Sequence, residues 1–284
     1  MNKNKERLKV VENIKKAVED GEFNRKVELG DPVITQDQRE KVIVRYDSLK
    51  KNIINKLKYL VITKLTHKIM LDVNKETEIV GLENIENLNT GAIITSNHFN
   101  VVDTTIIRYM LYKIGKESKM NIIVQETNFF MEGKFGPLIR NNKTIPLSLD
   151  HNYISKNFEP TLEKLLKKKE FILIYPEEEM WYNYRKPRPT RSGAYRYAAK
   201  YNVPIIPCFT KIEDLDELDE NGFKKSKYVL YIMPPIYPEK DKNMRESKKE
   251  LQEKDYMCKT EMYESAYGKK LDYGFSAEED IAGW

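Results

Sequence analysis

A histidine and an aspartate five residues apart are the side chains of this sequence best suited to catalysis. They are His98 and Asp103, within the segment N-H-F-N-V-V-D at 97–103. A short apolar run precedes the segment and a helical pattern follows it. A histidine at a strand end, oriented by a carboxylate, can act as a base that activates a hydroxyl for attack on an acyl group. The alternative is a loop histidine beside a helix-capping aspartate, because Asp is favoured at helix N-termini.

The composition describes a soluble, globular protein. The chain has 284 residues, of which 40% are hydrophobic and 33% charged, so it can bury a large core and is not disordered. The net charge of +5 suits an anionic membrane surface or a phosphorylated substrate. This excess is too small to indicate nucleic acid, and we see no recognition motif for it. We therefore expect no nucleic-acid partner.

Cysteine and histidine usage indicates neither a disulfide framework nor a metal site. The two cysteines are Cys208 and Cys258, and a reducing cytoplasm is the simpler assumption for so few. The other histidines, His67 and His151, are far from His98 in sequence and lack metal-ligand spacing. We expect no metal and no bound cofactor.

No segment has the length and apolar character of a membrane span. The N-terminus, M-N-K-N-K-E-R-L-K-V-V-E, lacks the apolar core of a signal peptide. The best candidate, residues 59–71, is interrupted by Lys64, His67 and Lys68, well short of the roughly 18 apolar residues that a span needs. A protein of this kind that acts on lipid would lie on the membrane surface. We expect a cytoplasmic location, peripheral on the inner face of the membrane.

The N-terminal part of the chain is predicted to be helical. Apolar residues recur at helical spacing over residues 5–19, and again from Val42 to Met70. The second stretch carries lysines on its remaining face, which fits either a helix packed on the domain with a solvated face or a helix in the membrane interface. We assign residues 1–75 to an N-terminal helical element.

From residue 78 onward, short apolar strands alternate with helical segments. The expected strands are 78–80, 92–96, 121–125, 144–147, 171–175, 203–210 and 227–233. The expected helices are 103–114, 158–169, 193–200 and 244–266, with a loop or short helix at 135–140. This order predicts an α/β domain with a mostly parallel sheet flanked by helices and one hairpin at its edge. We assign residues 76–268 to this domain and 269–284 to a C-terminal tail.

The order of four short motifs resembles the glycerolipid acyltransferase family, which includes the 1-acylglycerol-3-phosphate acyltransferases. The blocks are N-H-x4-D at 97–103, F-G-P-L-I-R at 135–140 with I-P-L at 145–147, Y-P-E at 175–177, and V-P-I-I-P at 203–207. The resemblance covers residues 81–238 and is more specific than any one block. It implies a membrane-facing α/β domain behind helices. It also implies transfer of a fatty acyl group from acyl-CoA or acyl carrier protein to a hydroxyl of a lysolipid acceptor.

The third block departs from the family pattern. Where members have glycine, threonine and arginine after the P-E pair, this chain has Glu178, Glu179 and Met180. The resemblance assigns that arginine to the acceptor's phosphate, which a planar guanidinium binds with two hydrogen bonds. The second block also lacks its usual arginine, since residues 148–150 are S-L-D.

Two explanations remain open for the missing arginines. Cations nearby could replace them, and the candidates are Arg140, Arg185, Lys186, Arg188 and Arg191. Alternatively, the acceptor carries no phosphate at this position, as in a glycolipid or an aminolipid, which a carboxylate-rich pocket would suit better.

The resemblance assigns roles to specific residues. His98 is the expected general base, and Asp103 orients its ring and stabilises the imidazolium. The expected substrate-binding residues are Asn97, Arg140, Glu177, Glu178, Arg185, Arg188 and Arg191. The alternatives to an acyltransferase are a catalytically silent lipid-surface or scaffold protein on the same fold, and an enzyme that only hydrolyses the thioester.

Overall fold

The computed structural model describes residues 3–30, 32–39, 41–42, 53–131, 133, 135–140, 142–220 and 222–284. Of the helix expected between Val42 and Met70, residues 43–52 lie outside the described residues. The rest of that prediction corresponds to α3, Ile53–Val73.

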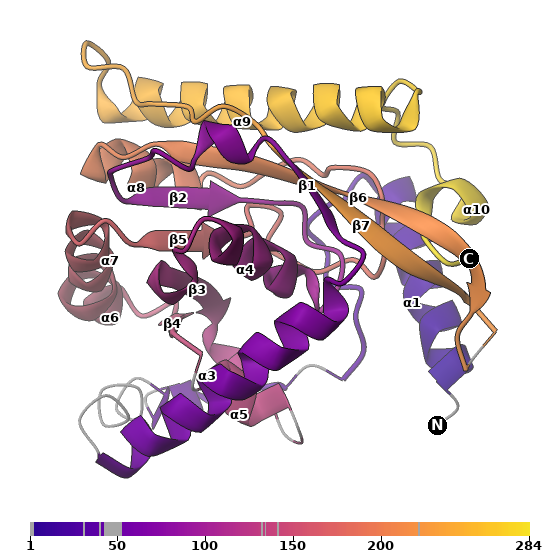
Figure 1. Ribbon diagram of the computed structural model, residues 1–284, viewed down its shortest axis with the longest axis horizontal. Helices are drawn as coiled ribbons and strands as arrows, with labels where there is room; N and C mark the ends of the chain where they lie inside the picture. The colour runs from indigo at the N-terminus through magenta and orange to yellow at the C-terminus, as the bar shows by residue number, and fades with distance from the viewer. Residues whose placement is uncertain are drawn as a thin grey trace.

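Seven strands form one mostly parallel sheet in the order β1-β7-β6-β2-β5-β3-β4. Their bounds are β1 Glu78–Val80, β2 Ala92–Thr95, β3 Met120–Gln125, β4 Thr144–Leu147, β5 Phe171–Ile174, β6 Ile205–Leu218 and β7 Lys224–Ile232. Only β6 and β7 pair antiparallel. The expected hairpin exists, but its edge position is wrong, because β1 pairs in parallel with the outer side of β7. The hairpin projects beyond the rest of the sheet (Figure 1).

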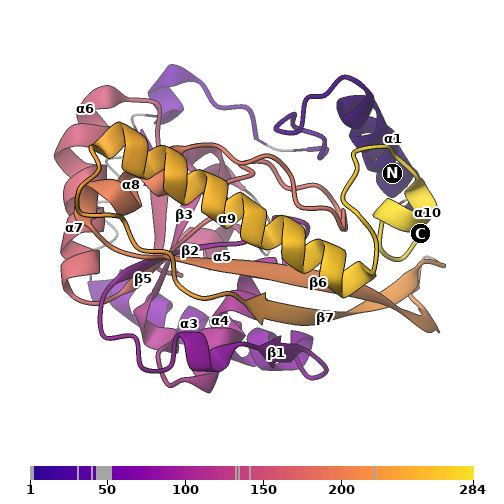
Figure 2. The ribbon, with the colours of Figure 1, turned by 90° about the horizontal axis from the view of Figure 1, so that it is seen from above.

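Helices cover both faces of the sheet. The longer ones are α1 Lys3–Glu19, α3, α4 Asp103–Lys113, α7 Glu159–Lys167, α8 Gly193–Tyr201 and α9 Met244–Tyr267. Short α5 Phe135–Arg140, α6 His151–Tyr153 and α10 Ala277–Asp280 complete the α-helices named here. The remaining short helical segments are Leu82–Asn84, Glu117–Lys119, Glu126–Phe130 and Ile154–Phe158. Figures 1 and 2 show α9 running along the sheet, on the opposite side from α3 and α4.

The core follows from the alternation of side chains along the buried strands. In β2 and β5, Ile94 and Leu173 pack in one cluster with residues of α4, whereas Ile93 and Ile172 pack in another with residues of α7 and α8. Successive residues of a strand point to opposite faces, so a strand covered on both faces is apolar throughout. The expected runs at 92–96 and 171–175 are such strands.

A buried polar cluster fixes the end of β2 beneath α9. Thr95 donates to the Asp255 carboxylate at 2.6 Å, and Lys259 binds the same carboxylate at 2.8 Å. Tyr195 of α8 donates to Oδ2, the same Asp255 oxygen that Lys259 binds, whereas Thr95 donates to Oδ1. Because all of these groups are paired, their burial is tolerated. The chain therefore leaves β2 toward His98 from a firmly held point.

The parallel arrangement brings two of the sequence motifs to one edge of the sheet. Strands β2 and β5 are neighbours and run in the same direction, so the segments that follow them, 96–103 and 175–191, leave from the same edge. In open α/β sheets, ligands bind outside the carboxyl ends of the strands. This is the edge at which the site is assembled.

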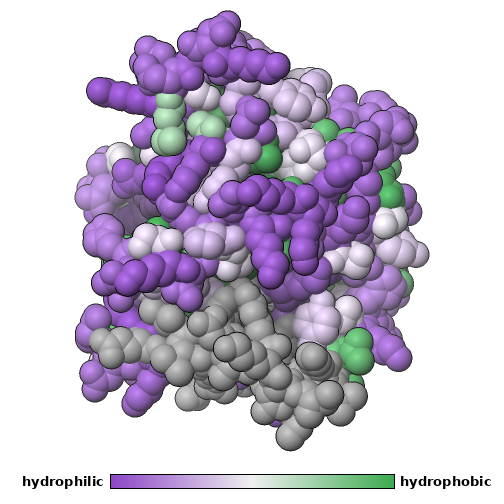
Figure 3. Space-filling model, turned by 90° about the vertical axis from the view of Figure 1, so that its left-hand side faces the viewer, coloured by the Kyte–Doolittle hydropathy of each residue, from purple (hydrophilic) through white to green (hydrophobic). Residues whose placement is uncertain are grey.

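The chain termini pack together beside the second of these segments. Val11 and Ile14 of α1 lie in one buried cluster with Trp181, Tyr184 and Ile281. The C-terminal tail also pairs with the 175–191 segment through an isolated bridge between Tyr184 and Ile281. The tail thus forms part of the support of that segment. The face at the α6 and α7 end of the molecule is largely hydrophilic (Figure 3).

Candidate active site

His98 and Asp103 form a close hydrogen-bonded pair at the carboxyl edge of the sheet. The Nδ1 atom of His98 lies 2.7 Å from Oδ2 of Asp103. That same oxygen accepts from the backbone N–H of Phe99 at 3.1 Å. Because a carboxylate only accepts, Nδ1 carries the proton and Nε2 of the neutral ring is left as the acceptor. Within the described chain, no protein group is hydrogen-bonded to Nε2, which leaves it free to take a proton.

Tyr175 supports both members of the pair, and sequence reasoning missed it. Its hydroxyl donates to Oδ1 of Asp103 at 2.7 Å, and its ring stacks on the His98 imidazole with centroids 3.9 Å apart. Burial, together with the Asp103 charge, raises the pKa of the Tyr175 hydroxyl well above its usual value. The hydroxyl therefore stays protonated and keeps donating. The signal available in sequence was an aromatic residue ending a buried strand immediately before the P-E pair.

The backbone of His98 is held from both sides by the third block. Oε2 of Glu177 accepts from the His98 N–H at 3.1 Å. The His98 carbonyl accepts from the N–H of Trp181 at 3.1 Å and from Arg188 at 3.3 Å. These contacts fix the main chain on which the imidazole is carried.

Glu177 and Arg188 form a buried ion pair behind His98. Their side chains are 3% and 1% exposed, and Nη2 of Arg188 lies 2.9 Å from Oε2 of Glu177. Arg188 also donates to the carbonyls of Phe23 and Glu179, and its guanidinium lies over the Trp181 ring, 4.5 Å from the centroid. A buried pair of charges is tolerated when its remaining donors and acceptors are satisfied in this way. The contacts of Arg188 are all made within the protein.

Two further cations of the same segment are occupied by carboxylates. Arg185 lies 2.6 Å from Asp214, and Lys186 lies 2.9 Å from the buried Asp280. Arg185 also donates to the Glu279 carbonyl at 2.7 Å. The cations predicted to replace the phosphate-binding arginines thus tie the 175–191 segment to the hairpin and the C-terminal tail.

The remaining predicted site residues lie in different surroundings. Asn97 is buried and bonded through both its amide atoms to the backbone of Thr210, at 2.8 and 3.0 Å. Arg140 donates to the carbonyls of Phe129 and Met131. Asn97 therefore anchors the His98 loop to β6, and Arg140 closes the loop before α5.

Glu178 and Arg191 lie at the surface and form a loose ion pair. Nε of Arg191 lies 3.5 Å from Glu178, with both side chains more than half exposed. Beside them, Glu179 accepts from Gln125 at 3.0 Å across the ends of β5 and β3. The rim of the site is thus acidic, with Arg191 as the exposed cation of this segment.

Neither cysteine is placed to act as a nucleophile. Cys208 is fully buried in β6, and burial raises the pKa of its thiol to about 12. A thiol with that pKa is almost entirely protonated near neutral pH and reacts poorly. In the described residues, no group of three or more metal-binding side chains is placed to hold a metal ion.

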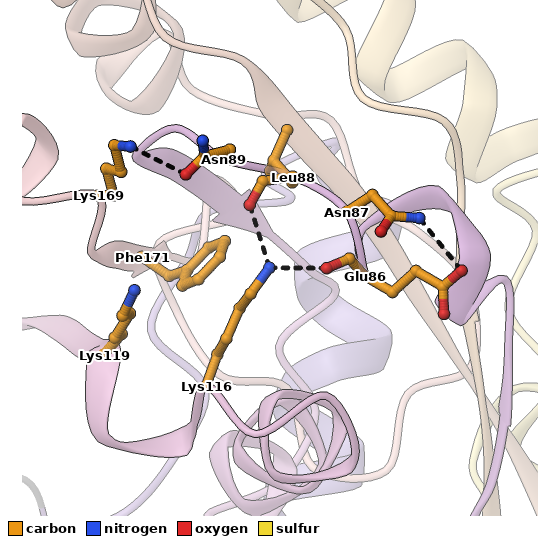
Figure 4. Close-up of a pocket in the computed structure, with 8 residues that line it drawn as sticks. All are labelled: Glu86, Asn87, Leu88, Asn89, Lys116, Lys119, Lys169 and Phe171. Carbon is orange, nitrogen blue, oxygen red and sulfur yellow. Dashed lines mark hydrogen bonds between the residues drawn. The ribbon is translucent and has the colours of Figure 1, made fainter.

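A cavity of about 360 Å³ lies at the opposite, amino edge of the sheet (Figure 4). Two of its lysines hold the loop before β2: Lys116 donates to the carbonyls of Glu86 and Leu88, and Lys169 to the side chain of Asn89. All three hydrogens of Lys116 are taken by carbonyls, since Ile85 accepts the third at 3.4 Å. This hollow is away from His98, and its geometry is explained by loop anchoring.

Three comparisons with known proteins agree with one another. Residues 76–211 match a family model described as Acyltransferase. A 1-acyl-sn-glycerol-3-phosphate acyltransferase, the chloroplastic BAT2 of Brassica napus, is 27% identical over 146 residues, which are 51% of this chain and 40% of the relative. This chain thus matches less than half of the length of that relative.

A solved structure has the same fold. The 1-acyl-sn-glycerophosphate acyltransferase PlsC of Thermotoga maritima superposes with a TM-score of 0.52 at 16% identity, covering 96% of this chain and all of that one. Its similarity extends across the helical N-terminus as well as the sheet. The family match over residues 76–211, the relative and the shared fold thus make this chain similar to the glycerolipid acyltransferases.

Proposed function

We propose that this protein transfers a fatty acyl group from acyl-CoA or acyl carrier protein to a hydroxyl of a lysophospholipid or related lipid. The observation that carries the proposal is the His98–Asp103 pair, at 2.7 Å, with Nε2 free of protein partners in the described chain. A base oriented in this way does not need a protein nucleophile.

The reaction can be written with the residues present. The acceptor oxygen attacks the thioester carbonyl carbon while Nε2 of His98 takes the hydroxyl proton. Asp103 stabilises the imidazolium, as in hydrolase triads. The carbon–sulfur bond then breaks, and the thiolate leaves as a thiol after taking the proton back from His98. The products are an ester and a free thiol.

Product analysis tests this function. The purified protein is incubated with an acyl-CoA and a lysolipid, and the lipids are identified by mass spectrometry. An acylated lipid supports the proposal. Free fatty acid without acylated lipid would identify a thioesterase, and no turnover of any donor and acceptor pair would favour a silent lipid-surface protein.

The surroundings of His98 favour an acceptor that does not rely on an arginine-bound phosphate. Met180 occupies the family's arginine position, and the neighbouring cations Arg185, Lys186 and Arg188 are held by protein carboxylates. Exposed carboxylates at the rim would repel a phosphate and suit a hydroxyl-rich or amine-bearing head group. A competition among lysophosphatidate, a monoacylated glycolipid and an aminolipid tests this. Preference for lysophosphatidate would contradict it.

The α3 helix is proposed to bring the protein to a membrane surface. Its outer side exposes Leu60, Val61 and Leu65 beside Lys58 and Lys64. Apolar side chains flanked by lysines favour an anionic lipid interface. Among the described helices, none is long and apolar enough to cross a bilayer. We therefore propose a peripheral association with the inner face of the cytoplasmic membrane, testable by co-sedimentation with vesicles.

A further inference from the structure

A second cavity, of about 290 Å³, lies between α3 and α4, away from the edge that carries His98. It is lined from α3, α4, the Glu117–Lys119 turn and the residues just before β4. Figure 1 shows α3 lying across α4 on the side of the molecule opposite to α9. His98 precedes the first turn of α4, whereas this cavity is formed by Arg108 in the middle of α4, by the turn before β3 and by the residues just before β4. The cavity is thus separate from the acyl-transfer site.

The charges around this cavity are predominantly positive. Lys64, Arg108 and Lys143 line it, and Glu117 is its one carboxylate among the lining residues of the described chain. Lys143 forms an ion pair with Glu170 at 3.4 Å and donates a hydrogen bond to the Ser118 carbonyl. Even when the charge of Lys143 is balanced by Glu170, the cavity holds more cationic than anionic charge.

Arg108 is the distinctive residue of the cavity. Its side chain is only 7% exposed, and burial lowers the pKa of its guanidinium. It makes one close side-chain hydrogen bond in the described structure, to Asn142 at 2.8 Å, and a long ion pair to Glu117 at 3.9 Å. Glu117 is itself engaged by His67 at 2.8 Å. A buried guanidinium has five N–H donors, so this one is incompletely paired.

We propose that this cavity binds a phosphate group against Arg108. A phosphate would accept two parallel hydrogen bonds from the guanidinium and would offset the excess positive charge. Lys64 at the rim supplies a second cation, and Tyr59 and Ser118 supply hydroxyls in the lining. The phosphate is either that of a lipid head group, reached because α3 also carries the exposed apolar residues, or a free phosphate. This assignment does not depend on the proposed acyl transfer.

Two binding measurements test the site. The first titrates the full-length protein with inorganic phosphate by calorimetry. The second measures co-sedimentation with vesicles of phosphatidylcholine, with or without phosphatidylglycerol. Both use the wild type, Arg108→Gln, Lys64→Gln and Lys68→Gln. The last is the matched control, because Lys68 is an exposed lysine one turn further along α3 that does not line the cavity.

The expected result is saturable binding that both cavity variants weaken by about tenfold, as the loss of a charge-assisted hydrogen bond predicts, while Lys68→Gln changes it much less. Binding of inorganic phosphate identifies a free-phosphate site. Binding of phosphatidylglycerol vesicles alone identifies a head-group site. If Arg108→Gln does not fold, the binding measured for Lys64→Gln against Lys68→Gln tests the proposal alone. Absence of both kinds of binding in the wild type, or equal losses in Lys64→Gln and Lys68→Gln, overturns the proposal.

Discussion

The molecule contains two histidine–carboxylate pairs with nearly the same local geometry. His98 Nδ1 lies 2.7 Å from Asp103, and His67 Nδ1 lies 2.8 Å from Glu117. Their surroundings differ. The Asp103 side chain is 3% exposed and is held by Tyr175 and by backbone N–H groups, whereas Glu117 is 19% exposed and is shared with Arg108.

The difference shows that support, and not the pair distance, distinguishes the proposed catalytic base from the other histidine. The Asp103 carboxylate keeps one position because each of its oxygens has a fixed donor, so the His98 ring has one orientation. The other pair joins α3 to the Glu117–Lys119 turn, and its histidine is 37% exposed on the side of a helix. His98 also lies where strands of a parallel sheet end, which is where substrates approach.

The sharpest test of the comparison is removal of each histidine. His98→Ala should lower kcat for acyl transfer by about 10³-fold, since general base catalysis supplies 10²–10⁴-fold. His67→Ala should mainly lower the free energy of unfolding, by about 1 kcal/mol for one lost hydrogen bond. Steady-state kinetics and urea unfolding separate the two effects. The exposed His151→Ala is the control for loss of any histidine. Turnover of His98→Ala within a few-fold of the wild type would remove the proposed mechanism.

Replacing each carboxylate by its amide is the next test. Asp103→Asn should lower kcat by about 10²-fold or more, because an amide can present its N–H to Nδ1 and favour the wrong tautomer. Glu117→Gln should have a kcat close to that of the wild type when both are measured with an acceptor that is soluble as a monomer. If kcat falls only a few-fold in Asp103→Asn, the role of Asp103 is to stabilise the N-terminus of α4 and not to orient His98.

The support behind His98 can be broken without touching the imidazole. Glu177→Gln leaves the Arg188 charge buried without a counter-ion, which should cost about 3 kcal/mol of unfolding free energy. It should also lower kcat, because Glu177 accepts from the backbone N–H of His98. Glu178→Gln, the exposed neighbour, is the matched control. Equal stability of the two variants in denaturant titrations would show that the buried pair does not hold this segment.

The sequence predicted the elements and the contact between His98 and Asp103 better than the surroundings of the charged residues. The apolar runs at 78–80 and 144–147 were confirmed as strands because their alternation and flanking turns are local. The hairpin was wrongly expected at the edge, since nothing local to residues 78–80 shows that they pair with β7. The partners of Arg188 and Arg185, at Phe23, Asp214 and Glu279, are equally distant in sequence. Spacing therefore could not show that these cations face the protein interior.

Tyr175 supplies a test that separates stacking from hydrogen bonding. Tyr175→Phe keeps the ring over His98 but removes the donor to Asp103, and kcat should fall by about tenfold, the size expected for one hydrogen bond to a charged group. Tyr175→Leu should lose more, because it removes the stacked ring as well. Equal kinetics for Tyr175→Phe and the wild type would assign the support of the pair to backbone N–H groups alone.

The same residue makes the smallest predicted effect, on stability in alkali. The folded-state pKa of Tyr175 is raised well above the value of about 10 expected in the unfolded chain. Above pH 10 the unfolded state therefore releases a proton that the folded state retains, and stability falls as pH rises. This contribution is full below about pH 10 and is lost at about 1.4 kcal/mol per pH unit above it. Tyr175→Phe lacks the titrating group, so its unfolding free energy should fall less steeply between about pH 10 and 11.

Urea unfolding at several alkaline pH values measures this slope, with the exposed Tyr237→Phe as the control for loss of a tyrosine. A shallower slope in Tyr175→Phe alone would tie the burial of its hydroxyl to the Asp103 carboxylate. Equal slopes in the wild type and Tyr175→Phe would mean that the hydroxyl ionises as readily in the folded chain as in the unfolded one. The support of the Asp103 carboxylate would then come from the backbone N–H groups, and the distinction between the two pairs would rest on those groups and on the positions of the pairs in the fold.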